Sequence, residues 1–155
     1  MSYLDILTTV SGSLAASTNV LTGQAITATA VSTNAIDLGT GVRDVGEGET
    51  LYARFTVTKA FSTGTSVDMQ VVVADNANLT TGQKVLAATT AVAIANLTLG
   101  ARFALAVPPQ IGSKGQEFLG AKYVVVGTTD GEIVCDFGLD IQDGAKFYPT
   151  KMVVA

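Results

Sequence analysis

The sequence predicts an all-β protein, an antiparallel, jelly-roll-like β-sandwich of about eight strands with N- and C-terminal arms. Apolar and polar residues alternate in several short segments, as they do in strands with one buried face. Segments rich in Gly and polar residues separate these runs, and no long helical pattern stands between them. A chain of 155 residues is long enough for one two-layer core. Strand spacing alone leaves an immunoglobulin-like sandwich open as the alternative.

The pattern divides the chain into three parts. Residues 1–23 form an N-terminal arm, residues 24–142 the jelly-roll domain, and residues 143–155 a C-terminal tail. The arm opens with a short apolar segment and continues in Ser, Thr, Ala and Gly, a composition typical of exposed or partner-dependent segments. It either orders against a neighbouring molecule or forms an edge strand on its own domain.

The alternation of apolar and polar residues predicts the first strands of the domain. Two short strands are predicted within residues 24–38, and a loop rich in Gly and charge follows over residues 39–50. The next two strands place alternate residues toward the core. Their inward positions are Leu51, Ala53, Phe55 and Val57, then Val67, Met69, Val71 and Val73.

The middle of the domain is less regular. Residues 75–84 are predicted as a loop. Residues 84–99 contain alanines that favour helix, but their Thr and Val content favours strand and loop, with a break at Thr89-Thr90. Residues 100–107 alternate again until Pro108-Pro109 ends the strand, because proline donates no ladder hydrogen bond.

The segment Lys122–Gln142 is predicted as the central β-hairpin. An apolar run leads to Asp130-Gly131, which we expect to take the positive φ angles of a tight hairpin turn. The second arm alternates strictly. Its inward residues are Ile133, Cys135, Phe137, Leu139 and Ile141, and its outward residues are Glu132, Val134, Asp136, Gly138 and Asp140.

Composition indicates a protein that associates with other chains. Hydrophobic residues make up 48% of the chain and charged residues only 14%, against roughly 25% charged in a typical soluble domain. Thr, Ser, Ala and Gly must therefore cover much of the surface, and we expect permanent association. A net charge of -4 and a pI near 4.6 argue against nucleic acid as a partner, because such binding needs a basic patch.

The N-terminus predicts synthesis in the cytoplasm without secretion. No Lys or Arg precedes Arg43, so the basic segment of a signal peptide is missing. No run approaches the ~18 apolar residues of a membrane helix, so no membrane partner is expected. The single cysteine, Cys135, is predicted to be a small buried residue.

Residue types argue against an enzyme. The chain has no histidine, which removes the usual Ser-His-Asp and Cys-His systems and imidazole metal sites, and no phosphate-binding glycine loop appears. A Ca²⁺ site built from Glu132, Asp136, Asp140 and Asp143 is the remaining cation hypothesis, but solvated strand positions are the favoured interpretation. Asp75-Asn76-Ala77-Asn78 is likewise favoured as a turn over a calcium loop. We expect no cofactor.

Several segments together resemble a known family. Residues 24–39 (QAITATAVSTNAIDLG) and residues 43–49 (RDVGEGE) are similar to the first half of a tailed-phage capsid cement (decoration) protein of the Bordetella-phage type. Leu97, Gly100, Phe103 and Val107-Pro108 follow in the same order, as do Lys122-Tyr123 and residues 131–142. The resemblance covers about residues 24–142; the lead-in and the tail are longer than is usual there.

The resemblance implies a jelly-roll homotrimer on the outer capsid surface of the virion, bridging major capsid subunits. Two groups of contact candidates follow. The arm would lie on the shell, and the loop at 43–49 would lie at a subunit or capsid boundary. The candidates are Tyr3, Leu4, Ile6, Leu7, Arg43, Asp44, Glu47 and Glu49. In the alternative interpretation, the arm packs on its own sheet and Arg43 pairs locally with Asp44 or Glu47.

Two other functions remain as hypotheses. A jelly-roll carbohydrate-binding or tail-adhesin module would need exposed aromatic side chains, for which Tyr52 and Tyr123 are the outward candidates on strands. A small major capsid or neck protein is the third hypothesis.

Overall fold

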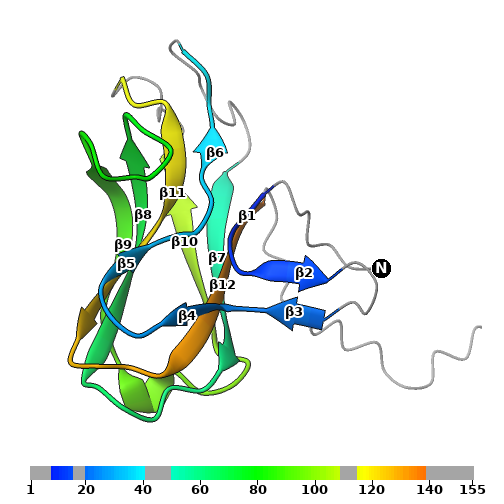
Figure 1. Cartoon of the computed structure of the whole chain (residues 1–155), viewed down its shortest axis with the longest axis vertical. Helices are drawn as coiled ribbons and strands as arrows, with labels where there is room; N and C mark the ends of the chain where they lie inside the picture. Colours follow the sequence, from blue (N-terminus) through cyan, green and yellow to red (C-terminus); the bar gives the residue numbers. More distant parts are fainter. Residues whose placement is uncertain (1–7, 16–19, 41–49, 109–114, 139–155) are drawn as a thin grey trace, which may run out of the picture.

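The computed structural model describes residues 8–15, 20–40, 50–108 and 115–138, which form two antiparallel sheets packed face to face (Figure 1). The first sheet contains β1 (Thr9–Ser11) and β4 (Gln24–Ile26), both paired with β12 (Gly131–Gly138), then β7 (Leu51–Lys59) and β10 (Arg102–Val107). The second contains β5 (Ala30–Val31) and β6 (Ile36–Asp37), both paired with β11 (Phe118–Val126), then β8 (Ser66–Ala74) and β9 (Lys84–Ala93).

The pairing is that of a jelly roll, as predicted. The chain resembles one long hairpin whose tip is the β8–β9 pair, folded over so that successive strands within each arm alternate between the two sheets. Moving outward from the tip, β7 pairs with β10, the broken strand β5 and β6 pairs with β11, and β4 pairs with β12. Counting β5 and β6 as one, these are the eight strands of the fold. The turn η1 (Ile94–Asn96) leads from β9 toward β10.

The core lies between the sheets and follows the predicted alternation. On β7 and β8 the inward residues from Ala53 to Val73 are buried, and Leu51 at the strand end is half-buried. Tyr123 of β11 meets Phe55 of β7 edge-on across the core, with ring centroids 6.1 Å apart. Such edge-to-face contacts add to the free energy of burial.

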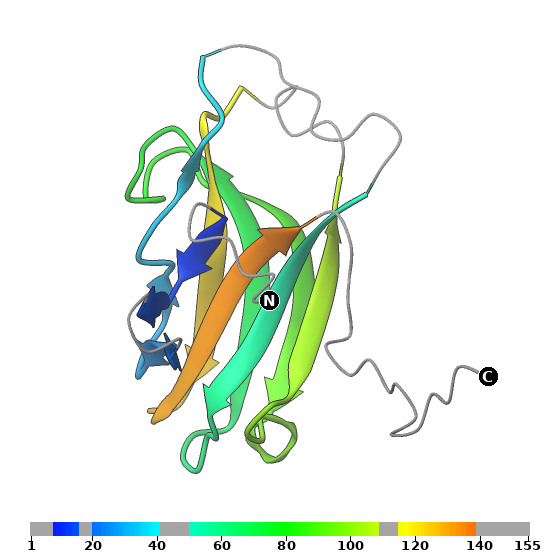
Figure 2. The same cartoon turned by 90° about the vertical axis from the view of Figure 1, so that its right-hand side faces the viewer.

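The prediction of a hairpin at Lys122–Gln142 is wrong, because its two arms belong to different sheets. β11 lies in the second sheet and β12 in the first, so residues 127–130 cross between them (Figure 2). Positive φ occurs at Gly127 and not at Asp130-Gly131. Gly131 is required for space instead, since an added Cβ would lie 2.2 Å from Phe61 Cδ2.

The prediction of which β12 side chains point toward the core is correct for the inward residues and wrong for two of the outward ones. Ile133, Cys135 and Phe137 are buried as expected, but Val134 and Asp136, expected in solvent, are buried as well. The reason is that the N-terminal chain covers the outer face: a Cβ added to Gly12 would lie 2.9 Å from Val134 Cγ2. The predictions for residues 139–142 lie outside the described residues.

The irregular middle segment behaves as predicted. Residues 84–93 form β9, and the expected break occurs at Thr90, whose φ is 62°. The β8–β9 register shifts near this point, and Thr89 Oγ1 accepts a hydrogen bond from the Met69 amide. Such a bulge locally blunts the edge of a sheet.

The N-terminal residues form two bent strands that run off the sandwich. β1 continues beyond Gly12 as β2 (Ser13–Ala15), and β3 (Val20–Thr22) continues beyond Gly23 as β4. β1 and β4 pair with β12, whereas β2 and β3 pair with each other and project away as a separate ribbon (Figure 1). For residues 9–11, the edge-strand alternative is therefore the one observed.

Candidate interaction surface

The contact residues predicted from the sequence fall outside the described part of the chain. They are Tyr3, Leu4, Ile6, Leu7, Arg43, Asp44, Glu47 and Glu49. The structure thus neither brings them together nor separates them. It reveals a different surface, which we build from the two long sides of the sandwich.

One long side is closed by hydrogen bonds between the sheets. The Asn34 amide donates to the Val10 carbonyl at 2.9 Å, which joins the second sheet to β1. The Gln24 side chain on β4 donates to the Val31 carbonyl at 2.8 Å and accepts from the Thr33 amide at 3.0 Å. These bonds satisfy backbone groups that would otherwise need water.

The opposite long side is open. β10 ends the first sheet and β9 ends the second, and among the described residues each pairs only with its inner neighbour. The inward side chains of Val92, Phe103 and Leu105 pack against the core but are only half-buried. Within the part of the chain that the structure describes, the outer backbone edges of both strands have no ladder partner.

An open groove of about 730 Å³ runs between these edges. Its lining comes from β9, the η1 turn and β10, and includes Ala88, Ala91, Val92, Asn96, Phe103 and Leu105. Apart from Thr89 and Asn96, the lining side chains are hydrocarbon. Polar atoms of these two side chains and of the strand backbones nevertheless make up about half of the exposed lining, so the groove is uncharged but mixed in polarity.

The groove is also free of charge. Residues 85–101 and 103–113 contain no Asp, Glu, Lys or Arg, so Lys84 and Arg102 are the only charged residues on the two edge strands. Monomeric proteins commonly protect long sheet edges with charged residues or proline. This signal was present in the sequence, but the strands had to be placed at sheet edges before it had meaning.

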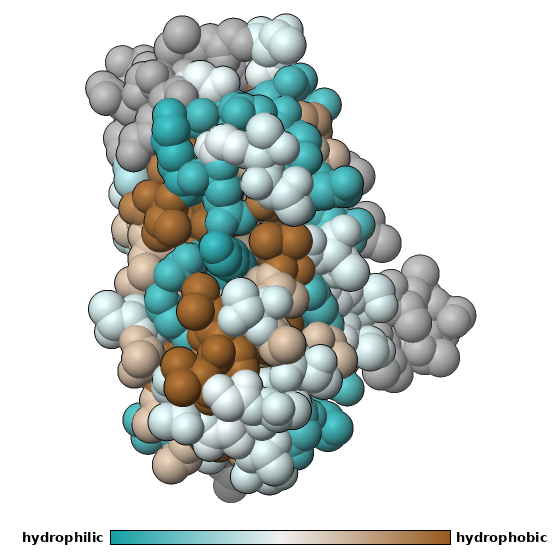
Figure 3. Space-filling view, turned by 60° about the vertical axis from the view of Figure 1, so that its left-hand side comes forward, coloured by the Kyte–Doolittle hydropathy of each residue, from teal (hydrophilic) through white to brown (hydrophobic). Residues whose placement is uncertain are grey.

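The outer face of the second sheet is more mixed (Figure 3). Val85 on β9 and Val126 on β11 are exposed, at 48% and 53%. Lys122 donates to Gln83 Oε1 at 2.7 Å and Gln70 donates to Asp68 Oδ2 at 2.7 Å. This band of satisfied polar groups makes the face less suited to permanent burial than the groove.

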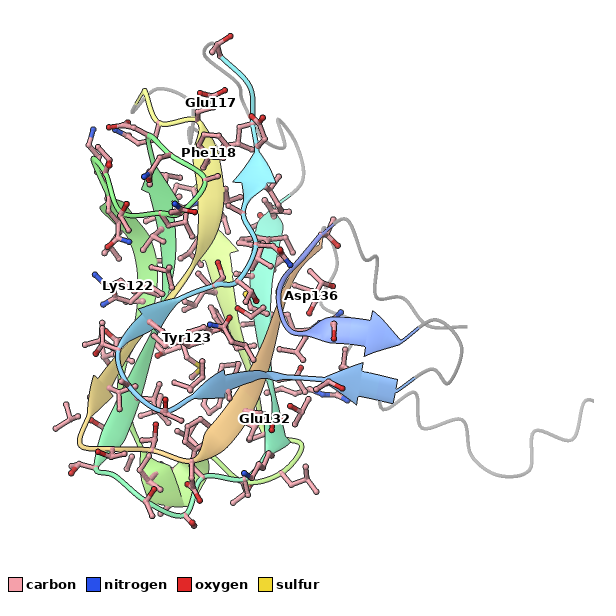
Figure 4. All side chains as sticks on the ribbon, in the orientation of Figure 1. Glu117, Phe118, Lys122, Tyr123, Glu132 and Asp136 are labelled. Atoms are coloured by element: carbon pink, nitrogen blue, oxygen red, sulfur yellow. The ribbon has the colours of Figure 1, made fainter. Side chains whose placement is uncertain are left out.

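Of the four carboxylates considered for Ca²⁺, Asp140 and Asp143 lie outside the described residues. Asp136 is buried and pairs with Arg54, whose Nε lies 3.1 Å from Asp136 Oδ1 (Figure 4). Asn76 Oδ1 accepts the Thr80 amide at 2.9 Å, as expected of a turn at 75–78. Among the described residues, no group of three or more Cys, Asp or Glu side chains is arranged to hold a metal ion.

The carbohydrate-binding hypothesis loses one of its two strand tyrosines. Tyr123 was expected to point outward, but it is fully buried between the sheets (Figure 4). Burial raises the pKa of its hydroxyl, and burial likewise raises the pKa of the neighbouring Cys135 thiol. Tyr52 is half-buried.

A comparison with protein-family models identifies the family. The Bbp16 model matches residues 20–135, most of the described sandwich. The chain belongs to the Bbp16 family. The family name indicates a Bordetella phage protein. No curated protein matches the chain. Within the described residues, no helix has the length and apolar character needed to cross a membrane.

Proposed function

We propose that this Bbp16-family protein is a structural virion protein, a capsid cement (decoration) protein. It binds the outer surface of an icosahedral phage head and stabilises contacts between major capsid subunits. Family membership over residues 20–135 is the observation that carries the proposal. The role needs no catalytic group and no cofactor.

The geometry supports this role. A jelly roll is a rigid block because both of its sheets share one core. The open groove leaves half-buried core side chains such as Phe103 and Leu105 at the surface, which a lasting partner would cover. Both features suit a protein that works by holding other chains in place.

The mechanism is multivalent binding. In a homotrimer, each contact with the major capsid protein occurs three times, so modest contacts add through effective concentration. Clamping several capsid subunits together raises the free energy needed to separate them under internal DNA pressure. The net charge of -4 suits an outer surface that binds neither nucleic acid nor membrane.

The decisive test uses phage heads that lack the protein. Purified protein is added and the particles are imaged by cryo-electron microscopy. We expect new protrusions over a complete shell, and a higher temperature of head disruption. A complete shell without added density contradicts the proposal, and a shell that assembles only with this protein indicates a major capsid protein.

The N-terminal contact candidates need a separate test. Deleting residues 1–7 leaves every described contact in place, whereas deletion through residue 11 also removes β1 and the bonds from Val10 and Ser11. We expect the shorter deletion to keep the unfolding temperature and to weaken head binding. Unchanged head binding would remove Tyr3, Leu4, Ile6 and Leu7 from the proposal without affecting the rest.

A further inference from the structure

We infer that Asp130-Gly131 is a site of spontaneous aspartate isomerisation, and that the turn carrying Ser62 and Thr63 blocks this reaction in the folded protein. The chemistry is independent of the proposed function. The chain has two Asp-Gly pairs, and the other one, Asp143-Gly144, lies outside the described residues.

An Asp-Gly pair carries both reactants of the isomerisation. Glycine has no side chain to shield its amide nitrogen. The Gly131 nitrogen attacks Cγ of the protonated Asp130 side chain, a carbon–nitrogen bond forms, and the amide hydrogen leaves with the carboxyl hydroxyl as one water. Water then opens the resulting succinimide ring. Opening at the main-chain carbonyl gives isoaspartate, so the net reaction neither adds nor removes atoms and needs no cofactor.

Four donors of the turn hold the Asp130 carboxylate. Oδ1 accepts the Ser62 amide at 2.8 Å, the Thr63 amide at 3.1 Å and the Thr63 hydroxyl at 3.2 Å, while Oδ2 accepts the Ser62 hydroxyl. Ring closure moves Cγ to bonding distance from the Gly131 nitrogen and expels one oxygen. Hydrogen bonds to the turn must therefore be given up before the reaction can occur.

The same hydrogen bonds keep the carboxyl group in its less reactive form. Bonds from the Ser62 hydroxyl, then from the Ser62 amide and from Thr63, lower the pKa of Asp130 well below its ordinary value of 3.8. The carboxyl is thus ionised at neutral pH. An ionised carboxyl is a poor target for the amide nitrogen, because the oxygen that leaves must first be protonated.

The backbone is fixed on both sides of Asp130. Thr129 is buried, and its hydroxyl donates to the Ile26 carbonyl. Gly131 pairs with Ile26 at the start of β12 and packs on Phe61, where an added Cβ would lie 2.2 Å from Cδ2. The succinimide ring contains the Cα–C bond of Asp130 and therefore fixes its ψ angle. Neighbours held this firmly oppose the rotation that ring closure requires.

The turn between Phe61 and Thr65 is held by bonds of its own. The Phe61 amide donates to the Leu97 carbonyl at 3.1 Å, and the Thr65 amide donates to the Val126 carbonyl at 2.9 Å. Both ends of the turn are thus fixed independently of Asp130. Removing a hydroxyl from the turn should leave its backbone in place, so the block can be weakened without unfolding the protein.

Isomerisation would damage the first sheet at its central strand. In isoaspartate the main chain runs through Cβ and Cγ, which lengthens it by one atom directly before β12. This strand pairs with β1, β4 and β7, and Phe61 leaves Gly131 no room to shift. Blocking the reaction therefore keeps the sheet intact as the protein ages.

The test follows the folded, full-length chain during warm storage at neutral pH. Proteolytic cleavage after Glu132 separates the two Asp-Gly pairs, and mass spectrometry with electron-based fragmentation measures isoaspartate at each. We expect Asp130 to react far more slowly in the folded wild type than in the same chain in urea. Asp130→Glu should give no signal at this position, because its longer side chain cannot close a five-membered ring.

Ser62→Ala/Thr63→Ala removes both hydroxyl donors at exposed positions and should react several times faster than wild type. Ser62→Ala alone should lie between the two. Thr128→Ala is the matched control, since this exposed side chain makes none of the Asp130 hydrogen bonds, and it should react at the wild-type rate. Circular dichroism shows that the variants are folded.

Tyr123→Phe separates the local block from global stability. It removes a buried hydrogen bond far from the turn and keeps all four donors to Asp130, so its rate should stay close to that of wild type. Three results would overturn the inference: a folded wild type that reacts as fast as the chain in urea, a double variant no faster than wild type, or a Tyr123→Phe variant as fast as the double variant.

Discussion

The Tyr123 hydroxyl donates a hydrogen bond of 2.7 Å to Ser11 Oγ, and both side chains are fully buried. The bond joins β11 in the second sheet to β1 in the first, across 112 residues of sequence. It satisfies the one polar group of an otherwise apolar ring in the core. β1, a strand of three residues, is thereby fixed from inside the sandwich as well as through β12.

Replacing Tyr123 by Phe should lower the free energy of unfolding by about 1–3 kcal/mol, because Ser11 Oγ then loses a buried partner. The double variant Tyr123→Phe/Ser11→Ala should cost less than the sum of the two single variants, since neither partner is then left alone. Urea unfolding at one fixed protein concentration measures both. Tyr52→Phe, a half-buried tyrosine on β7, should change the value by less than about 0.5 kcal/mol. A double variant whose loss in unfolding free energy equals the sum of the two single losses would contradict an interaction between Tyr123 and Ser11.

Stability should fall at alkaline pH in two steps. Burial, with a smaller contribution from the Asp136 charge, raises the pKa of Cys135 above its ordinary value of 9.0. Burial and Cys135 raise the pKa of Tyr123 above 10.0, although the Ser11 bond opposes this. Groups held neutral in the fold stabilise it fully below their unfolded pKa and lose this effect as the pH rises. The free energy of unfolding should therefore decline above about pH 9.

Cys135→Ala isolates the thiol from the tyrosine. In this variant the decline should begin about one pH unit later, in the range where the unfolded tyrosine ionises. The absolute stability is expected to be lower because of the smaller side chain, so the pH of onset is the quantity to compare. The same onset in both proteins would exclude the thiol as its cause.

Asp130 should stabilise the fold at neutral pH and lose this effect in acid. Hydrogen bonds from the Ser62 hydroxyl and amide, and then from Thr63, lower the pKa of Asp130 well below its ordinary value of 3.8. A lowered pKa stabilises the fold above about pH 4, and this is lost as the pH falls toward the folded value. Asp130→Asn should thus reduce the unfolding temperature at pH 6, with a gap to wild type that narrows near pH 2.5.

Ser62→Ala serves as the partner variant for this test. It keeps the carboxylate but removes one donor, so it should give a smaller gap with the same dependence on pH. A gap that stays constant between pH 6 and pH 2.5 would show that Asp130 acts through packing alone.

Removing one member of the Arg54–Asp136 ion pair should lower the free energy of unfolding more than replacing both members by apolar residues. The Asp136 side chain is only 5% exposed and that of Arg54 20%, so Arg54→Met leaves a buried carboxylate unpaired. We expect a loss of about 3 kcal/mol in the free energy of unfolding. Arg54→Met/Asp136→Leu should recover most of it, while Lys59→Met, an exposed cation on the same strand, should change little. A double variant as unstable as Arg54→Met would contradict this account.

Local patterns predicted the parts of the fold that depend on local chemistry. Alternation identified the buried faces of β7 and β8, since a strand must hide one face whichever strand it pairs with. The break at Thr89-Thr90 was also visible, because two threonines interrupt the alanine and valine run where the register shifts.

The pairing of strands depends on distant residues and was harder to predict. Thr128-Thr129-Asp130-Gly131 resembles a hairpin turn, but the same residue types also serve a crossing between sheets, where Asp130 binds Ser62 and Thr63. Val134 and Tyr123 were assigned to solvent for the same reason: what covers Val134 is a chain turn more than 120 residues earlier, at Gly12. The open groove depends equally on which strands end the sheets.

The pairing of early strands with late ones also has a consequence for folding during synthesis. β12 is the last described strand to leave the ribosome, yet it lies in the first sheet between β7 on one side and β1 and β4 on the other. The earliest strands must therefore wait, with their apolar faces uncovered, until β12 has been translated. Completion of the first sheet then depends on contacts between residues far apart in the sequence, which are slow to form. Uncovered apolar surface is prone to aggregation during that delay, so the nascent chain is a natural client of chaperones.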